Sequence, residues 1–239
     1  MKKIVTSEPV VAVMRKENQL DLLAASAEPA IVVPPYWADA CKHLVKKDRV
    51  LKRLIPRLGN TCLQSRGDAF STLARSIVSQ QISVKAAQTV WQRFCALLPF
   101  QEVTPGQVLL LKVDDMRAAG LSARKVEYLV DLSIHFDAGR VHMQDWQGMA
   151  DEAIIAELIA IRGIGRWTAE MFLMFYLVRP NVLPLDDVGL INGISRNYFS
   201  GEAVSRSDAR EVAAAWTPYC SVATWYIWRS LDPLPVLAV

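Results

Sequence analysis

The sequence predicts an all-α protein built from short helices. Apolar residues recur at helical spacing through most of the chain, and few segments alternate between apolar and polar residues as half-buried strands do. Residues with β-branched side chains are scattered among alanines and leucines. The 239 residues are 52% hydrophobic and 21% charged, which is typical of a globular protein. We therefore expect roughly ten short helices.

Charge and cysteine content narrow the class of protein further. The net charge of +3 permits an anionic partner without requiring one. No two cysteines form a C-x-x-C pair, so we expect neither a zinc site nor an iron–sulfur cluster. No apolar stretch is long enough for a signal-peptide core or a membrane span. We expect a cytoplasmic protein, nucleoid-associated if the source is bacterial, that makes no contact with a membrane.

The first half of the chain shows a leader followed by three helical segments. Residues 1–35 lack a sustained period, which predicts a loose leader. A helical pattern begins at Trp37 and stops at Pro56. Asp68 is a candidate N-cap for the next helix, which ends at a polar break. A further helix is expected over residues 84–98.

The second half shows five further helical segments. Proline is favoured at the first helical position, so Thr104-Pro105 predicts the start of a short helix. Helices are also expected over residues 114–119 and 122–136. Asp151 is expected to cap the next helix, and another runs from Trp167 to Val178.

Two glycines, Gly163 and Gly165, separate the last two of these helices. Glycines allow a tight turn with exposed amides, and the following helix adds the positive end of its dipole. Arg162 and Arg166 beside them favour phosphate. The segment predicts a grip on a nucleic-acid backbone, although the spacing also fits a plain helix–turn–helix joint. A dinucleotide loop is excluded because Thr168 occupies its last glycine position.

The run I-R-G-I-G-R-W-T-A followed by L-P-L-D-D-V-G resembles the helix–hairpin–helix and Gly/Pro-Asp loop of a DNA glycosylase superfamily. Within it the chain resembles the 3-methyladenine DNA glycosylase II branch, in a compact form without the N-terminal β domain. The resemblance extends to residues 76–83 and 216–221 and to Trp225 and Trp228. It covers roughly residues 35–231.

The resemblance implies two helical lobes with a cleft between them. Residues 36–67 and 188–239 form one lobe, and residues 68–187 form the central lobe with the hairpin. It also implies a monomer that binds double-stranded DNA with a damaged base. It further implies an enzyme that flips out an alkylated purine, such as 3-methyladenine or 7-methylguanine, and hydrolyses its N-glycosidic bond to leave an abasic site. Trp167 stands where strand-cleaving members carry lysine, and residues 126–239 contain no lysine, so we expect a monofunctional enzyme.

The site residues follow from the same resemblance. Asp187 matches the catalytic carboxylate, which would stabilise a sugar cation, while Asp186 is expected to cap the next helix. Aromatic rings would hold a cationic base by stacking and cation–π attraction. The base-pocket candidates are Trp167, Trp228, Met171, Trp37 and Tyr36. Met171 replaces a tyrosine and Arg229 replaces an aromatic residue of the larger enzymes, which leaves the substrate range open.

DNA contacts and a cation site complete the expected site. The amides of Gly163, Gly165 and Thr168 would grip the backbone. Gln81, with Ile82 beside it, would fill the gap left by the flipped base, although a surface polar break explains the same residues. No cofactor is required. A structural monovalent cation in the hairpin would be held by the carbonyls of Ile159, Ile161 and Ile164.

Three other functions stay open on the sequence alone. One is a glycosylase for another lesion, such as hypoxanthine, ethenoadenine or uracil. The second is a non-catalytic protein that binds DNA structures through the hairpin. The third is a helical protein-interaction module, whose binding would not fall steeply with salt as phosphate contacts do.

Overall fold

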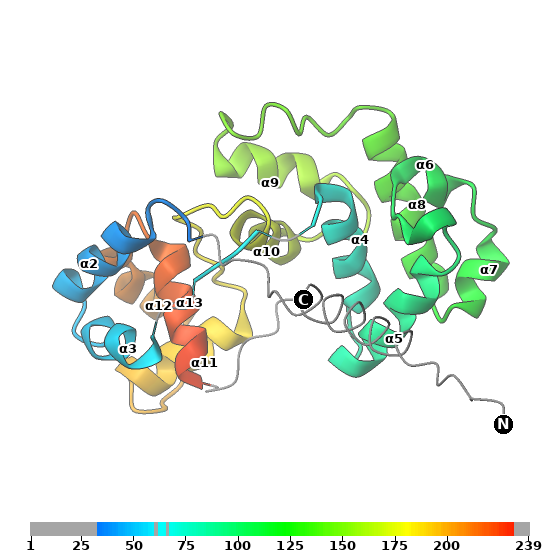
Figure 1. Cartoon of the computed structure of the whole chain (residues 1–239). Helices are drawn as coiled ribbons and strands as arrows, with labels where there is room; N and C mark the ends of the chain where they lie inside the picture. The colour runs from blue at the N-terminus through cyan, green and yellow to red at the C-terminus, as the bar shows by residue number, and fades with distance from the viewer. Residues whose placement is uncertain (1–32, 60–61, 66, 232–239) are drawn as a thin grey trace, which may run out of the picture. The chain divides into compact units, whose positions relative to one another are not determined.

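The computed structural model describes residues 33–59, 62–65 and 67–231 (Figure 1). The expected leader therefore lies almost entirely outside the described residues. The described part contains twelve α-helices and two 3₁₀-helices and no strand, so the all-α prediction is confirmed. The α-helices are α2 (Trp37–Lys47), α3 (Leu51–Leu58), α4 (Ala69–Ser79), α5 (Val84–Cys95), α6 (Pro105–Leu109), α7 (Val113–Ala118), α8 (Ala123–Asp137), α9 (Asp151–Ile159), α10 (Arg166–Phe175), α11 (Val188–Tyr198), α12 (Arg206–Ala213) and α13 (Cys220–Leu231). The 3₁₀-helices are η1 (Pro99–Gln101) and η2 (Ala214–Trp216). None of the described helices is long and apolar enough to cross a membrane.

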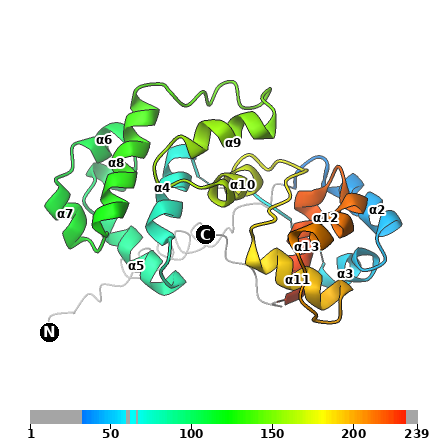
Figure 2. The ribbon, with the colours of Figure 1, turned by 180° about the vertical axis from the view of Figure 1, so that it is seen from behind.

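One group of helices surrounds α13. This helix contacts α2, α3 and α11, and α12 contacts α11 and η2 (Figures 1 and 2). All residues of α13 from Cys220 to Trp228 are buried, which explains why its sequence shows little amphipathic pattern. The N-terminal and C-terminal parts of the described chain therefore share one core.

A second group of helices lies around α8 and α10. Helix α8 contacts α4, α6 and α7, while α10 contacts α9 and α4. The division into two lobes and the cleft between them stay predictions.

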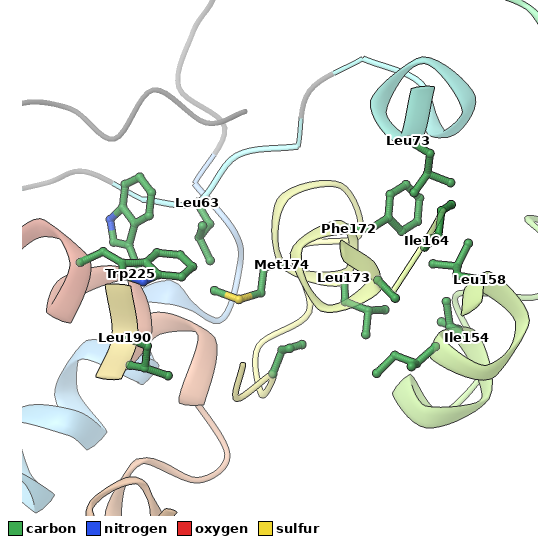
Figure 3. Close-up of a cluster of buried hydrophobic side chains, with 14 of the residues drawn as sticks. Leu63, Leu73, Ile154, Leu158, Ile164, Phe172, Leu173, Met174, Leu190 and Trp225 are labelled. Atoms are coloured by element: carbon green, nitrogen blue, oxygen red, sulfur yellow. The ribbon is translucent and has the colours of Figure 1, made fainter. Parts of the chain in front are cut away.

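Helix α10 packs on two sides, and this positions the segment that precedes it. Figure 3 shows Phe172 and Leu173 directed toward Leu158 and its neighbours, whereas Met174 is directed toward Trp225. All five side chains are buried. This packing fixes the C-terminal half of α10, and the Gly-x-Gly segment directly precedes the other end of the same helix.

The prediction of a single helix that stops at Pro56 is wrong. The chain leaves the helical conformation at Asp48, whose Oδ1 accepts hydrogen bonds from the amides of Val50 and Leu51, each at 2.8 Å. These bonds satisfy donors at the start of α3, so a second helix begins there. Pro56 lies inside α3, two residues before its end, so it does not terminate this helix.

Two boundaries of other helices also differ from the prediction. Asp68 caps α4 as expected, since its Oδ1 accepts from the Ser71 amide at 2.9 Å. Asp151 is not a cap: it is the first residue of α9, and its carboxylate lies 3.4 Å from the Arg179 guanidinium. Helix α10 stops at Phe175, three residues before the expected end at Val178, and Val178 itself adopts a left-handed φ of 51°.

Candidate functional site

The carboxylate of Asp187 lies where three helices meet. Asp187 is the N-cap of α11, and its Oδ1 accepts from the Leu190 amide at 2.6 Å. Oδ1 also accepts from Nε1 of Trp228 on α13 at 2.7 Å. Oδ2 accepts from Nε1 of Trp167 on α10 at 3.0 Å. A carboxylate offers about four lone-pair positions, so one position on Oδ2 remains for a water molecule or a cationic centre.

The neighbouring aspartate has a different role from the one predicted. Asp186 is exposed, and its Oδ1 lies 2.6 Å from the Arg206 guanidinium. The expectation that Asp186 caps α11 is wrong, because Asp187 does so. Only the three-dimensional start of the helix decides which of two adjacent aspartates reaches its first amides.

The structure brings two of the predicted aromatic residues to Asp187. Trp167 is 38% exposed, whereas Trp228 is only 9% exposed. The ring of Trp228 stacks on Phe175, with 5.9 Å between centroids and 9° between planes. Met171 is half-buried one helical turn after Trp167. Sequence reasoning missed Phe175, because an apolar residue in a helix carries no signal of what it stacks on.

The two remaining pocket candidates have partners elsewhere. Trp37 is buried and packs at 6.0 Å against Tyr226. The hydroxyl of Tyr36 donates to the Val178 carbonyl at 2.6 Å, and burial raises the pKa of this phenol. These contacts give both residues a packing role, and their place in a base pocket stays a prediction.

The two glycines of the hairpin differ in whether the fold requires glycine at their positions. Gly163 has a φ of +87°, and a Cβ there would lie 2.3 Å from the ring of Tyr128. Gly165 has a φ of −91°, and no heavy atom lies within 4 Å of its Cβ position. The fold therefore requires glycine at 163, whereas nothing in the described structure requires it at 165.

The amides around these glycines are available to an anion. Within the described residues, the amides of Gly163 and Gly165 donate to no backbone acceptor. Thr168 lies in the first turn of α10, where amides have no intrahelical partner. Since the positive end of the α10 dipole is added to them, these amides form a suitable anion site.

Both arginines beside the hairpin are paired with carboxylates. Arg166 binds Glu152 at 2.5 Å and Glu170 at 3.0 Å, while Arg162 lies 3.1 Å from Glu127. Burial raises the pKa of Glu170, and Arg166 offsets part of this effect. An anion at this end of α10 would therefore be bound mainly by backbone amides, and less by the two arginines than the sequence predicted.

The turn between α4 and α5 exposes the residues predicted to enter DNA. Gln81 is exposed with a left-handed φ of 59°, and Ile82 is 39% exposed. Gln80, which sequence reasoning missed, donates from Nε2 to the Gly163 carbonyl at 2.9 Å. This bond ties the turn to the hairpin across 83 residues of sequence, a separation that no local pattern reveals.

Backbone oxygens are the donors at the predicted cation site. Ile159 ends α9, so its carbonyl has no intrahelical partner, whereas the Ile161 carbonyl already accepts from the Ile164 amide at 3.1 Å. Oxygen donors of this kind suit a hard cation. Elsewhere in the described chain, no cluster of His, Cys, Asp or Glu side chains could hold a metal ion.

Comparison with known proteins identifies the family. Residues 74–218 match the family described as HhH-GPD superfamily base excision DNA repair protein. The chain belongs to this superfamily, which confirms the resemblance found in the sequence.

Individual relatives agree with this assignment. The crystal structure of a DNA-3-methyladenine glycosidase from Bacillus halodurans has a TM-score of 0.76 at 36% identity, covering 81% of this chain and 89% of that one. The Schizosaccharomyces pombe 3-methyladenine DNA glycosylase in complex with abasic DNA has a TM-score of 0.73 at 29% identity, covering 82% and 98%. The Bacillus subtilis protein YfjP is 34% identical over 204 residues, which are 82% of this chain and 71% of YfjP.

Proposed function

We propose that this protein is a monofunctional DNA glycosylase for alkylated purines of the 3-methyladenine and 7-methylguanine type. It flips the damaged base out of double-stranded DNA, hydrolyses the N-glycosidic bond and leaves an abasic site for base excision repair. The names of its relatives in Bacillus halodurans and Schizosaccharomyces pombe support the substrate class.

One observation carries the proposal: a single side chain joins the anion site to the carboxylate. Trp167 lies in the first turn of α10, two residues after Gly165, and its indole N–H binds Oδ2 of Asp187. A phosphate at the amides and a sugar at the carboxylate would therefore be neighbours along one DNA strand. The fixed negative charge would stabilise the positive sugar that forms as the base leaves.

The proposed reaction needs no covalent intermediate. Trp167 occupies the position of the lysine in strand-cleaving members, and its nitrogen already donates to Asp187. An indole nitrogen cannot form a Schiff base, so the proposed nucleophile is water. The exposed face of Trp167 offers a surface for a cationic base, by stacking and cation–π attraction.

The direct test is to incubate methylated duplex DNA with wild type and Asp187→Asn. Wild type should release free methylpurine, and the strand should break only after alkali. Loss of one preorganised electrostatic group costs about 10²–10³-fold in rate, and we expect at least this loss. Asparagine can still cap α11, so the fold should persist. Full activity of Asp187→Asn would overturn the assignment of the carboxylate.

Substrate range and partners are tested in the same system. Duplexes with hypoxanthine, ethenoadenine or uracil show whether another lesion is preferred. We further propose that the protein acts as a monomer on DNA in the cytoplasm or nucleoid. Light scattering with and without duplex should give one protein per lesion, whereas two copies per lesion would contradict this. The hairpin carbonyls are proposed to bind a monovalent cation, and binding of duplex DNA in potassium and in a bulky organic cation tests this.

A further inference from the structure

We infer that Gly189 and Trp228 are positioning residues that set the orientation of the Asp187 carboxylate. The inference rests on the proposed catalytic role of Asp187. It gives Trp228 a role other than the base-stacking one that the family resemblance implies, and it assigns a role to a glycine that no sequence pattern singled out.

The ring of Trp228 is nearly buried, and its N–H edge is directed at Asp187. One face of its ring lies against Phe175 at an interplanar angle of 9°, and the side chain is 9% exposed. Its Nε1 donates to Oδ1 of Asp187 at 2.7 Å. To turn this ring away would break both the stacking contact and the hydrogen bond, so the donor stays in place.

Oδ1 of Asp187 is thereby fixed from two elements. The Leu190 amide reaches it from α11 at 2.6 Å, and Trp228 reaches it from α13. Two short bonds from different directions define the rotation of the carboxylate and direct Oδ2 to the exposed side, where Trp167 lies. A rotation of the carboxylate would move the remaining lone pair away from the reacting sugar.

Gly189 provides the space that this arrangement needs. A Cβ at this position would lie 3.0 Å from Oδ1 of Asp187 and 3.2 Å from both Cδ1 and Nε1 of Trp228. Its backbone φ lies outside the left-handed region, and alanine is the better helix former, so neither conformation nor helix propensity requires glycine here. The requirement comes from the carboxylate–indole pair, which an added methyl group would push apart by a few tenths of an ångström.

The test combines Gly189→Ala with Gly106→Ala as its control. Gly106 also occupies the second position of a helix, α6, and no heavy atom lies within 4 Å of its Cβ position. Gly106→Ala should not lower the unfolding temperature, and in Gly189→Ala the gain in helix propensity should offset the cost of the close contacts. In single-turnover base release, Gly106→Ala should keep the wild-type rate. Gly189→Ala should lose about tenfold or more, since even 1 Å of misplacement can cost about a hundredfold. Affinity for an uncleavable duplex should stay within about twofold.

A second variant separates positioning from base stacking. Trp228→Phe keeps an aromatic ring against Phe175 but removes the N–H. A positioning role predicts that kcat falls about tenfold or more while KM is unchanged, whereas a stacking role predicts a small loss with a raised KM. If Trp228→Phe does not fold, Gly189→Ala decides alone.

The outcomes separate this inference from the proposed function. Wild type without base release on any duplex would overturn the proposed function, and the inference would fall with it. An active wild type and inactive Asp187→Asn, together with unaltered kcat in Gly189→Ala, would overturn the inference alone. A loss of kcat in Gly189→Ala but not in Gly106→Ala would support it.

Discussion

Replacement of Gly163 by alanine should destabilise the protein for two separable reasons. The residue has a φ of +87°, which L-residues other than glycine rarely adopt. In addition, its Cβ would lie 2.3 Å from Cδ2 and Cγ of Tyr128, well inside van der Waals contact. The backbone at residue 163 and the ring of Tyr128 on α8 would both have to shift.

The magnitude follows from these two terms. A left-handed conformation costs about 1–2 kcal/mol for a residue with a Cβ, and overpacking costs about 1–3 kcal/mol. Together they predict a loss of about 2–5 kcal/mol in the free energy of unfolding. For a domain of this size, a loss of 1 kcal/mol lowers Tm by about 2–4 °C, so we expect a decrease of about 4–20 °C.

Two other glycines provide matched controls in thermal unfolding. Gly139 has a left-handed φ of +64° but no heavy atom within 4 Å of its Cβ position, so Gly139→Ala should show only the backbone cost. Gly165 has neither strain nor a neighbour, so Gly165→Ala should keep Tm. If the hairpin grips DNA, Gly165→Ala should instead weaken duplex binding. The reasoning is refuted if Gly163→Ala lowers Tm no more than Gly139→Ala does.

Three further changes test other parts of the structure. Asp48→Ala should cost about 2–6 kcal/mol in urea unfolding, because it leaves the part-buried hydroxyl of Tyr198 and the buried indole N–H of Trp216 unpaired at about 1–3 kcal/mol each. A loss below about 1 kcal/mol would contradict this. Burial raises the pKa of Glu170, so its charged form destabilises the fold as pH rises through the folded-state pKa. Glu170→Gln should therefore raise Tm at neutral pH, and the gain should vanish as pH falls below 4.5, the ordinary value; a gain independent of pH would argue against it. Gln81→Gly should keep or raise Tm, because it relieves a left-handed φ of 59°, yet it should slow base release; unaltered release would exclude Gln81 as the group that fills the DNA gap.

Local interactions account for the parts of the fold that could be predicted from the sequence. The cap at Asp68 depends on the amide of Ser71, three residues away, and the start of α6 depends on the ring of Pro105. Helical periodicity likewise involves residues within one or two turns. Such features are present in any short stretch of the chain, so they can be recognised before the tertiary structure is known.

Predictions failed where a distant partner decides the outcome. Asp48 divides the first helical segment through Oδ1, which binds nearby amides, but this carboxylate is buried only because Tyr198 and Trp216, 150 and 168 residues away, donate to its Oδ2. Arg166 was expected to face phosphate, but Glu152 and Glu170 bind its guanidinium. No pattern in the sequence indicates such pairs, because they exist only after the helices have packed.

Patterns within the sequence are enough to show that this protein is all-α, where most of its helices lie, and which superfamily its hairpin and aspartate resemble. The way in which Asp187 is held depends on the packed fold, because its donors come from α10, α11 and α13 and meet through packing of buried side chains. The same applies to Gly189. Its missing Cβ matters only because the indole of Trp228, which is 41 residues away from Asp187 in the sequence, donates a hydrogen bond to the Asp187 carboxylate beside it. Periodicity and capping are short-range and can be recognised in the sequence, whereas the orientation of a carboxylate depends on contacts that folding alone brings together.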